Sequence, residues 1–242
     1  MQELAATPIA VACRLRIVDG FELTLAGEPV RLPVSVQRLL TFLAVQGPAQ
    51  SRMHVAFTLW AGASEGHAYG SLRSALFRLQ AAGCRLVIVS KDELELAPEV
   101  AVDLRERLAL VERLLAGETD EMELELDPAL LVGDVLPDCY EDWVLFERER
   151  YHELRLRALE ALCERELRAG RLPQAVAAGQ AAVRADPLRD SARRALIRAD
   201  LAEGNNAEAL AQYRDFEQQL RDELGLQPSG EMIELVASLT GR

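Results

Sequence analysis

Residues 66–83 read GHAYGSLRSALFRLQAAG, and this stretch predicts an amphipathic helix around which the first part of the chain is arranged. Apolar or small side chains recur with helical spacing on one face, at Ala68, Tyr69, Leu72, Ala75, Leu76 and Leu79. The opposite face is small in its first turns and carries Arg73 and Arg78 at its two edges. Such a face suits a helix that enters the major groove of DNA. It also fits a solvated surface helix whose arginines only confer solubility, so the flanking sequence has to decide.

Charge divides the chain into two unequal parts. Residues 1–105 contain ten Lys and Arg against ten Asp and Glu, whereas residues 106–242 contain 17 against 29. The second part therefore repels nucleic acid, and contact with DNA is expected only from the first. With 242 residues, half of them hydrophobic, the chain is long enough for two ordinary domains with aliphatic cores.

Nothing in the sequence indicates secretion or insertion into a membrane. The four cysteines lack the paired spacing of a disulfide framework or a zinc site, so free thiols in a reducing compartment are expected. The first ten residues, MQELAATPIA, lack the basic and apolar regions of a signal peptide. No apolar run reaches the length of a membrane span. We therefore expect a cytoplasmic protein without membrane contact.

Catalytic patterns are also lacking. His54, His67 and His152 lie apart from any nucleophile-like arrangement. The sequence contains neither an HExxH motif nor a glycine-rich phosphate loop that ends in Lys-Ser or Lys-Thr. The carboxylates of the second part are dispersed, as on ordinary solvated helix faces. We predict that the protein is not an enzyme, with no catalytic residue, no metal site and no cofactor.

The elements around residues 66–83 follow the order of a winged helix. Short strands are expected at 14–18, 21–25 and 30–32, and a hairpin of strands at 85–90 and 93–96 turns through Lys91-Asp92. Between them, one helix is expected to be capped by Ser35 and a second to begin at Ser51. The second helix is expected to bury Met53, Val55, Ala56, Leu59 and Trp60. A sheet, three helices and a hairpin predict a domain whose third helix reads DNA and whose hairpin is the wing.

The chain changes character at Asp103 and becomes helical. One helix is expected to end at Gly117 and a long one at Gly170, and a final helix is expected at 224–239. The stretch around Gly170 is repeated around Gly204, and this shift of 34 residues is the tetratricopeptide period. Such a helical stack usually presents a concave surface to a partner. The candidate partner contacts, which are otherwise ordinary surface residues, are Arg194, Arg198, Tyr213 and Arg214.

Together these features resemble the SARP-type bacterial transcriptional regulators. The resemblance is carried by GSLRSALFRL at 70–79, Trp143, Phe146-Glu147-Arg148, Asp186-Pro187 and LRDELGLQP at 220–228. It implies an OmpR-like winged helix at 1–102 and a bacterial transcriptional activator domain at 103–242, a mainly α fold with a small β component. It further implies an activator that recognises direct repeats in double-stranded DNA near promoters, usually as two copies on tandem sites, and that engages RNA polymerase.

The predicted DNA contacts lie mainly on the third helix. Arg73 and Arg78 are expected to donate to phosphates or guanine edges, and Ser71 and Ser74 to hold the DNA backbone. His67 is either a further DNA contact or a solvent-exposed residue at the start of the helix.

Three further candidates lie outside that helix. Lys91 at the wing tip either reaches a phosphate or makes no contact. Ser51 and Arg52 could hold a phosphate at the start of the second helix, although a plain helix cap is the alternative for Ser51.

A protein-interaction scaffold is the alternative function. In that case the winged helix keeps its fold but has lost DNA binding, which the neutral charge of the first part and the uncharged Gln80-Ala81-Ala82 would allow. If DNA is bound, few phosphates can be neutralised. One copy should then bind weakly and a second copy should supply the remaining affinity.

Overall fold

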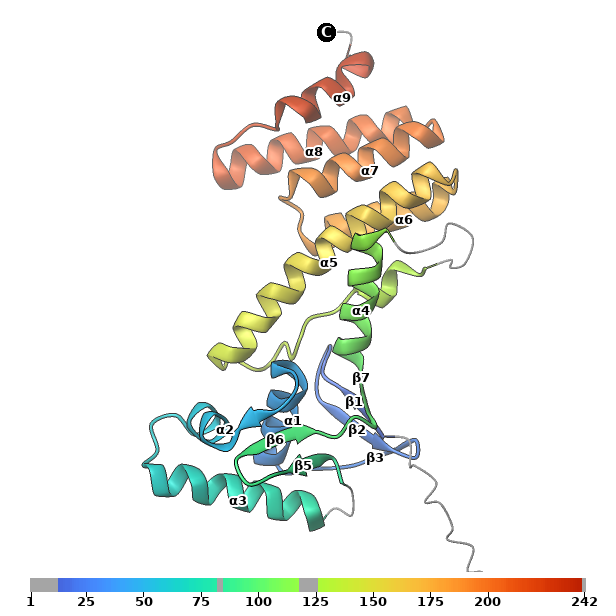
Figure 1. Ribbon diagram of the computed structural model, residues 1–242. Coiled ribbons are helices and arrows are strands. Elements are labelled where there is room, and N and C mark those ends of the chain that lie inside the picture. Colours follow the sequence, from blue (N-terminus) through green and yellow to red (C-terminus); the bar gives the residue numbers. More distant parts are fainter. Residues whose placement is uncertain (1–12, 82–84, 118–125, 241–242) are drawn as a thin grey trace, which may run out of the picture. The chain divides into compact units, whose positions relative to one another are not determined.

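The computed structural model describes residues 13–81, 85–117 and 126–240 of the chain (Figure 1). These residues divide into two compact units. The first contains the chain up to Glu106 together with Val135–Glu147, and the second contains Arg107–Asp134 and the chain from Arg148 onward. The predicted boundary between a winged-helix domain at 1–102 and an activator domain at 103–242 stays a prediction. The sequence did not predict that residues 135–147 belong to the first unit.

The N-terminal unit is built from short strands and from helices of two to five turns. The strands are β1 (Cys13–Arg16), β2 (Glu22–Leu25), β3 (Glu28–Pro29), β4 (Gln50–Ser51), β5 (Val87–Val89), β6 (Glu93–Leu96) and β7 (Val100–Val102). The helices are α1 (Val34–Gln46), α2 (Arg52–Leu59) and α3 (Glu65–Ala81).

Two small sheets frame the helices of this unit. One has the strand order β3-β2-β1-β7, with β1 antiparallel to β2 and parallel to β7, so that Leu15 pairs with both Leu23 and Val102. The other has the order β4-β6-β5 and contains the antiparallel β5–β6 hairpin, which is the predicted wing. Leu15, Leu23 and Val102 are all buried, so the first sheet turns one face toward the core.

The predicted inner face of α3 is confirmed except at Tyr69, which is half-buried and whose ring centroid lies 6.2 Å from that of Phe57 on α2. Ala68, Leu72, Ala75, Leu76 and Leu79 are all buried, as their spacing requires. They share the core with the buried residues of α1, which are Val36, Leu39, Leu40, Thr41, Phe42, Leu43 and Ala44.

Residues 135–147 complete the N-terminal unit through both backbone and side-chain contacts. Val135 forms an isolated β-bridge with Val18, and the next amide, of Leu136, donates to the carbonyl of Ile17 at 2.9 Å. Farther along, Glu141 accepts two hydrogen bonds of 2.6 Å from the guanidinium of Arg38 on α1. These contacts are separated by about a hundred residues in the sequence, which explains why local patterns did not predict them.

The C-terminal unit consists of stacked helices. Its elements are the later part of α4 (Asp103–Ala116), the 3-10 helix η1 (Pro128–Leu131), the later part of α5 (Asp142–Arg168), α6 (Leu172–Ala185), α7 (Asp190–Glu203), α8 (Asn206–Leu224) and α9 (Gly230–Thr240). The predicted repeat is present, because Gly170 and Gly204 end helices with φ angles of 72° and 86°. Ala175 and Ala209, five residues after each glycine, are fully buried.

A close approach between α6 and α7 depends on Gly179. A Cβ atom at this position would lie 2.9 Å from the Cα atom of Leu196, which is closer than real Cβ atoms approach backbone. The two helices therefore pack backbone against backbone at this point, as in other repeat arrays that bury alanine and glycine between neighbouring helices.

Two details of the helix expectations are wrong, and Trp60, which was expected to be buried, is half-buried. Ser35 does not cap α1, since the helix begins one residue earlier and the carbonyl of Pro33 accepts from the amides of Val36 and Gln37 at 2.9 and 3.0 Å. Met53 is 59% exposed. It lies on the outer side of the short helix α2, opposite the inward-facing Val55, because the two differ by about 200° around the axis.

Strand and helix bounds also differ from the expectations. The third strand covers residues 28–29 rather than 30–32, because the two-residue turn at Ala26-Gly27 has both φ angles positive and sets Glu28 directly opposite Leu25. The segment expected as one final helix at 224–239 divides, since α8 runs to Leu224 and α9 begins at Gly230. The sequence has an acidic run at 118–127, and its residues 118–125 lie outside the described part of the chain. The helix end expected at Gly83 also lies outside it.

Candidate nucleic-acid interface

The outer face of α3 carries two exposed arginines without a hydrogen-bond or ion-pair partner among the described residues. Arg73 and Arg78 are both exposed, and neither forms an ion pair or a hydrogen bond with any residue that the structure describes. Four other arginines of the N-terminal unit are engaged within it, whereas no side-chain hydrogen bond or ion pair engages Arg31, Arg52 or Arg85 among the described residues. The engaged ones are Arg14 with Glu106, Arg16 with Glu22, Arg38 with Glu141, and Arg105 with the carbonyls of Leu43 and Ala44. The α3 guanidinium groups thus keep their donors available for an external acceptor such as phosphate or a guanine edge.

The polar residues of α3 are partly engaged in local hydrogen bonds. The hydroxyl of Ser74 donates to the carbonyl of Gly70 at 2.9 Å, so its oxygen remains available only as an acceptor. His67 is exposed, and its Nδ1 lies 2.8 Å from the hydroxyl of Ser64, the residue before the helix. Ser71 is half-buried. The arginines are therefore better placed than these three side chains to donate to DNA.

The wing tip and the start of α2 meet in the structure. The amide of Arg52 donates to the carbonyl of Asp92 at 2.8 Å, next to the exposed Lys91. Ser51 is the N-cap of α2, and its hydroxyl accepts from the amide of His54 at 3.1 Å. The cap expected for Ser51 is confirmed, and a phosphate contact for these residues stays a prediction.

The surface of α3 and the wing carries exposed apolar side chains, of which Phe77 was predicted as a contact to a thymine methyl or as a packing residue, whereas those of β5 were not predicted as part of a site. Phe77 on α3 is 73% exposed, and Ile88 and Val89 on β5 are also exposed. Ile88, Val89 and the exposed Arg85 line a groove between α3 and β5, whereas Phe77 lies outside it. The sequence signal was the uninterrupted run Val87-Ile88-Val89, in which an edge strand places an apolar residue outward as well as inward.

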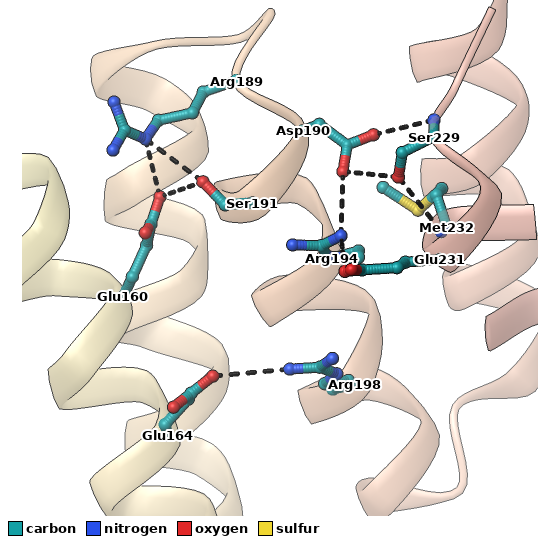
Figure 2. Close-up of polar contacts among 10 residues, drawn as sticks. All are labelled: Glu160, Glu164, Arg189, Asp190, Ser191, Arg194, Arg198, Ser229, Glu231 and Met232. Atoms are coloured by element: carbon teal, nitrogen blue, oxygen red, sulfur yellow. Dashed lines mark hydrogen bonds and ion pairs between the residues drawn. The ribbon is translucent and has the colours of Figure 1, made fainter.

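The predicted partner contacts of the helical unit differ in their availability (Figure 2). Arg194 on α7 pairs with Asp190 at 3.4 Å and also with Glu231 on α9. Arg198 lies 3.4 Å from Glu164 on α5. The pairs with Glu231 and Glu164 connect α7 to other helices, whereas the pair with Asp190 lies within α7. Arg194 is therefore engaged mainly inside the unit.

Tyr213 and Arg214 lie on α8 beside α9. Tyr213 is half-buried and packs against the core formed by Phe216, Met232 and their neighbours. Arg214 is exposed, and no described residue forms an ion pair with it. Of the predicted partner contacts, Arg214 is therefore the one most available to an external molecule.

Residues 102–240 match the protein family described as Bacterial transcriptional activator domain. The chain belongs to this family. The resemblance to SARP-type regulators is confirmed by relatives named Regulatory protein AfsR, 33% identical over 143 residues in Streptomyces griseus and 37% identical over 103 residues in Streptomyces coelicolor. The alignments cover 59% and 43% of this chain but 14% and 10% of the relatives, so the chain spans a small part of their length.

A solved structure supports the fold of this bacterial transcriptional activator family member over nearly its whole length. The structure of Mycobacterium tuberculosis EmbR in complex with a low-affinity phosphopeptide covers 96% of this chain with a TM-score of 0.71 and 22% sequence identity. The chain covers 66% of that protein. The predicted fold class, a winged helix followed by a tetratricopeptide-like helical domain, is confirmed.

The relatives of this family member are regulatory proteins rather than enzymes. In the described ranges, no group of three or more His, Cys, Asp and Glu side chains is arranged to hold a metal ion. None of the helices described for this chain has both the length and the apolar character needed to cross a bilayer.

Proposed function

We propose that this chain is a sequence-specific DNA-binding transcriptional regulator that inserts α3 into the major groove. The observation that carries the proposal is the pair of exposed guanidinium groups on α3, Arg73 and Arg78, which have no partner among the described residues. Lys91, in the turn between β5 and β6, is exposed and supplies a further cation. These residues form the predicted contact surface for double-stranded DNA.

The charge of the chain favours binding as two copies. Because residues 1–105 have equal numbers of basic and acidic side chains, each copy neutralises few phosphates. Two copies on tandem direct repeats would supply the affinity that one lacks. In this proposal the helical unit contacts RNA polymerase to activate transcription, in the cytoplasm where a bacterial chromosome lies.

The proposal is tested by selecting bound sequences from a random pool of double-stranded DNA and measuring gel retardation on the selected site. Replacing Arg73 and Arg78 together by alanine should abolish retardation at moderate salt. It should also lower the slope of log K against log salt by about 0.9 for each lost phosphate contact. Arg157→Ala on α5 is the matched control, because Arg157 is also exposed and has no partner in the described part of the chain.

The alternative function gives a different result in the same experiment. A protein-interaction scaffold with a degenerate winged helix would enrich no sequence and show no retardation even at low salt. If selection succeeds but the double variant binds like the wild type, the DNA contact lies elsewhere than on α3.

A further inference from the structure

A cavity of about 320 Å³ lies within the N-terminal unit, between the start of α1 and residues 136–143. This volume is in the range of sites for small organic molecules. Phe21, Val34, Leu136 and Trp143 form apolar and aromatic parts of its wall. These residues come from the β1–β2 connection, from α1 and from the segment that leads into α5, so the cavity depends on the folded unit rather than on one local motif.

Two charged groups of the wall, Arg38 and Glu141, neutralise one another. Arg38 donates two hydrogen bonds of 2.6 Å to Glu141 and a third, of 2.5 Å, to the carbonyl of Leu59. Glu141 also accepts from the indole nitrogen of Trp143 at 3.0 Å. The guanidinium is therefore not available for an anionic ligand, and the exposed carboxylate of Asp138 in the cavity lining would repel one.

One polar group of the wall remains without a partner. Thr41 is only 2% exposed, and its hydroxyl forms no hydrogen bond with any described residue. Thr41 lines the cavity, and its hydroxyl oxygen is not among the fully buried polar atoms without a partner, so it remains accessible to a ligand or to water. It offers a single hydrogen-bonding position among apolar surfaces, which is a common arrangement in sites for small organic ligands.

The backbone of the wall is held in an unusual conformation. Leu136 has a φ angle of 42°, in the left-handed region that a bulky residue rarely adopts, and it precedes Pro137. Its conformation is maintained by hydrogen bonds to Ile17 and from Cys139, both at 2.9 Å. Strained residues of this kind concentrate at ligand sites.

We propose that this cavity binds an uncharged aromatic small molecule. The rings would pack against Phe21, Leu136 and Trp143, and one polar atom of the ligand would form a hydrogen bond with the hydroxyl of Thr41. The site is independent of the proposed DNA contacts on α3, so the two proposals can fail separately.

The test uses two fluorescent probes with the same aromatic skeleton and the full chain. N-phenyl-1-naphthylamine is uncharged and carries one N–H group, whereas 8-anilino-1-naphthalenesulfonate adds a sulfonate. The uncharged probe should bind saturably with one site per chain, and the sulfonate should bind at least about tenfold more weakly because no free cation in the wall compensates it. Equal or tighter binding of the sulfonate would overturn the assignment of an uncharged ligand, and no saturable binding of the uncharged probe would overturn the site.

Variants locate the bound probe. Val34→Trp narrows the cavity at an exposed position and should weaken binding at least about tenfold, while Thr41→Val should weaken it about fivefold by removing one hydrogen bond. Val132→Trp is the matched control, since Val132 is an exposed valine of the helical unit. Thr41→Val preserves side-chain shape and decides the outcome if Val34→Trp does not fold.

A chemical readout gives the position independently. Cys139 lines the cavity and is half-buried, whereas Cys13 and Cys163 are buried. Saturating N-phenyl-1-naphthylamine should slow alkylation of Cys139 by N-ethylmaleimide at least about fivefold, measured by peptide mass spectrometry, if it occupies the cavity. Unchanged alkylation of Cys139, together with wild-type affinity in Thr41→Val, would place the probe elsewhere and overturn the proposal.

Discussion

Replacing Asp200 by asparagine should stabilise the protein at neutral and alkaline pH. Asp200 is 3% exposed on α7, and its Oδ2 has no hydrogen-bond partner among the described residues. Burial, followed by the nearby carboxylates of Glu208 and Glu203, raises the pKa of this carboxyl from 3.8 to about 6. The folded chain therefore carries an unpaired buried charge above this pH.

The direction of the pH effect follows from proton linkage. Between pH 3.8 and about 6, the folded state holds the Asp200 proton more tightly than the unfolded state, so this group makes stability fall as pH rises. Above that window the ionised Asp200 lowers the free energy of unfolding by roughly 3 kcal/mol, at about 1.36 kcal/mol per pKa unit. Asparagine keeps the shape and removes the charge, but its amide is still buried. We therefore expect a gain of about 1–3 kcal/mol near pH 8 and almost none near pH 4.

The assay is urea unfolding of the wild type and of Asp200→Asn at a series of pH values, followed by helical circular dichroism. Hydrogen exchange of the α7 amides gives the same comparison for the helical unit alone. Asp222→Asn on α8 is the matched control, because Asp222 is exposed and its substitution should change stability by less than about 0.5 kcal/mol at every pH. A difference between Asp200→Asn and wild type that is independent of pH, or that grows toward acid, would refute the reasoning.

Four other substitutions test the packing and polar contacts described above, each by denaturant unfolding. Gly179→Ala should lower the free energy of unfolding by about 1–3 kcal/mol because its Cβ would meet the backbone of α7. Gly70→Ala has open space around it and should raise the free energy of unfolding by up to about 1 kcal/mol through helix propensity. Equal effects of the two substitutions would contradict the close approach of α6 and α7 at Gly179. Burial opposes ionisation of Glu141, but hydrogen bonds from Arg38 and the Trp143 indole outweigh it and lower the pKa of this carboxyl. Glu141→Gln should therefore lower the free energy of unfolding by about 1–2 kcal/mol above pH 4.5. The difference should vanish in more acidic solution. Ser51→Ala should cost about 1 kcal/mol through loss of the α2 cap, and an unchanged midpoint would show that the cap contributes nothing.

The parts of the fold that local sequence patterns determine were predicted well. The inner face of α3 followed from helical periodicity alone, and the 34-residue repeat placed the turns at Gly170 and Gly204 because left-handed glycines end both helices. Strands β4 and β7 were missed, because two or three residues are too few to show alternation. Their existence depends on partners far away in the chain.

The candidate site was predictable to a similar extent. The exposure of Arg73 and Arg78 followed from their position on the helix, whereas the absence of partners required knowing which carboxylates lie near them. Arg194 shows the opposite case, since its ion pair with Glu231 needs the packing of α9 against α7, although its pair with Asp190 lies within α7. Sequence alone does not distinguish an arginine that pairs with a neighbouring helix from an exposed arginine that has no partner within the fold.

The return of residues 135–147 to the N-terminal unit has a consequence for how such proteins can be recombined. A chimaera that took only the first 106 residues from one relative would combine Ile17, Val18 and Arg38 with a foreign stretch in place of Val135, Leu136 and Glu141. Residues 135–147 of the other relative would then pack against a core whose side chains they do not match. Successful transplantation of the N-terminal unit should therefore require two separate segments from the same relative, the residues up to Glu106 and residues 135–147.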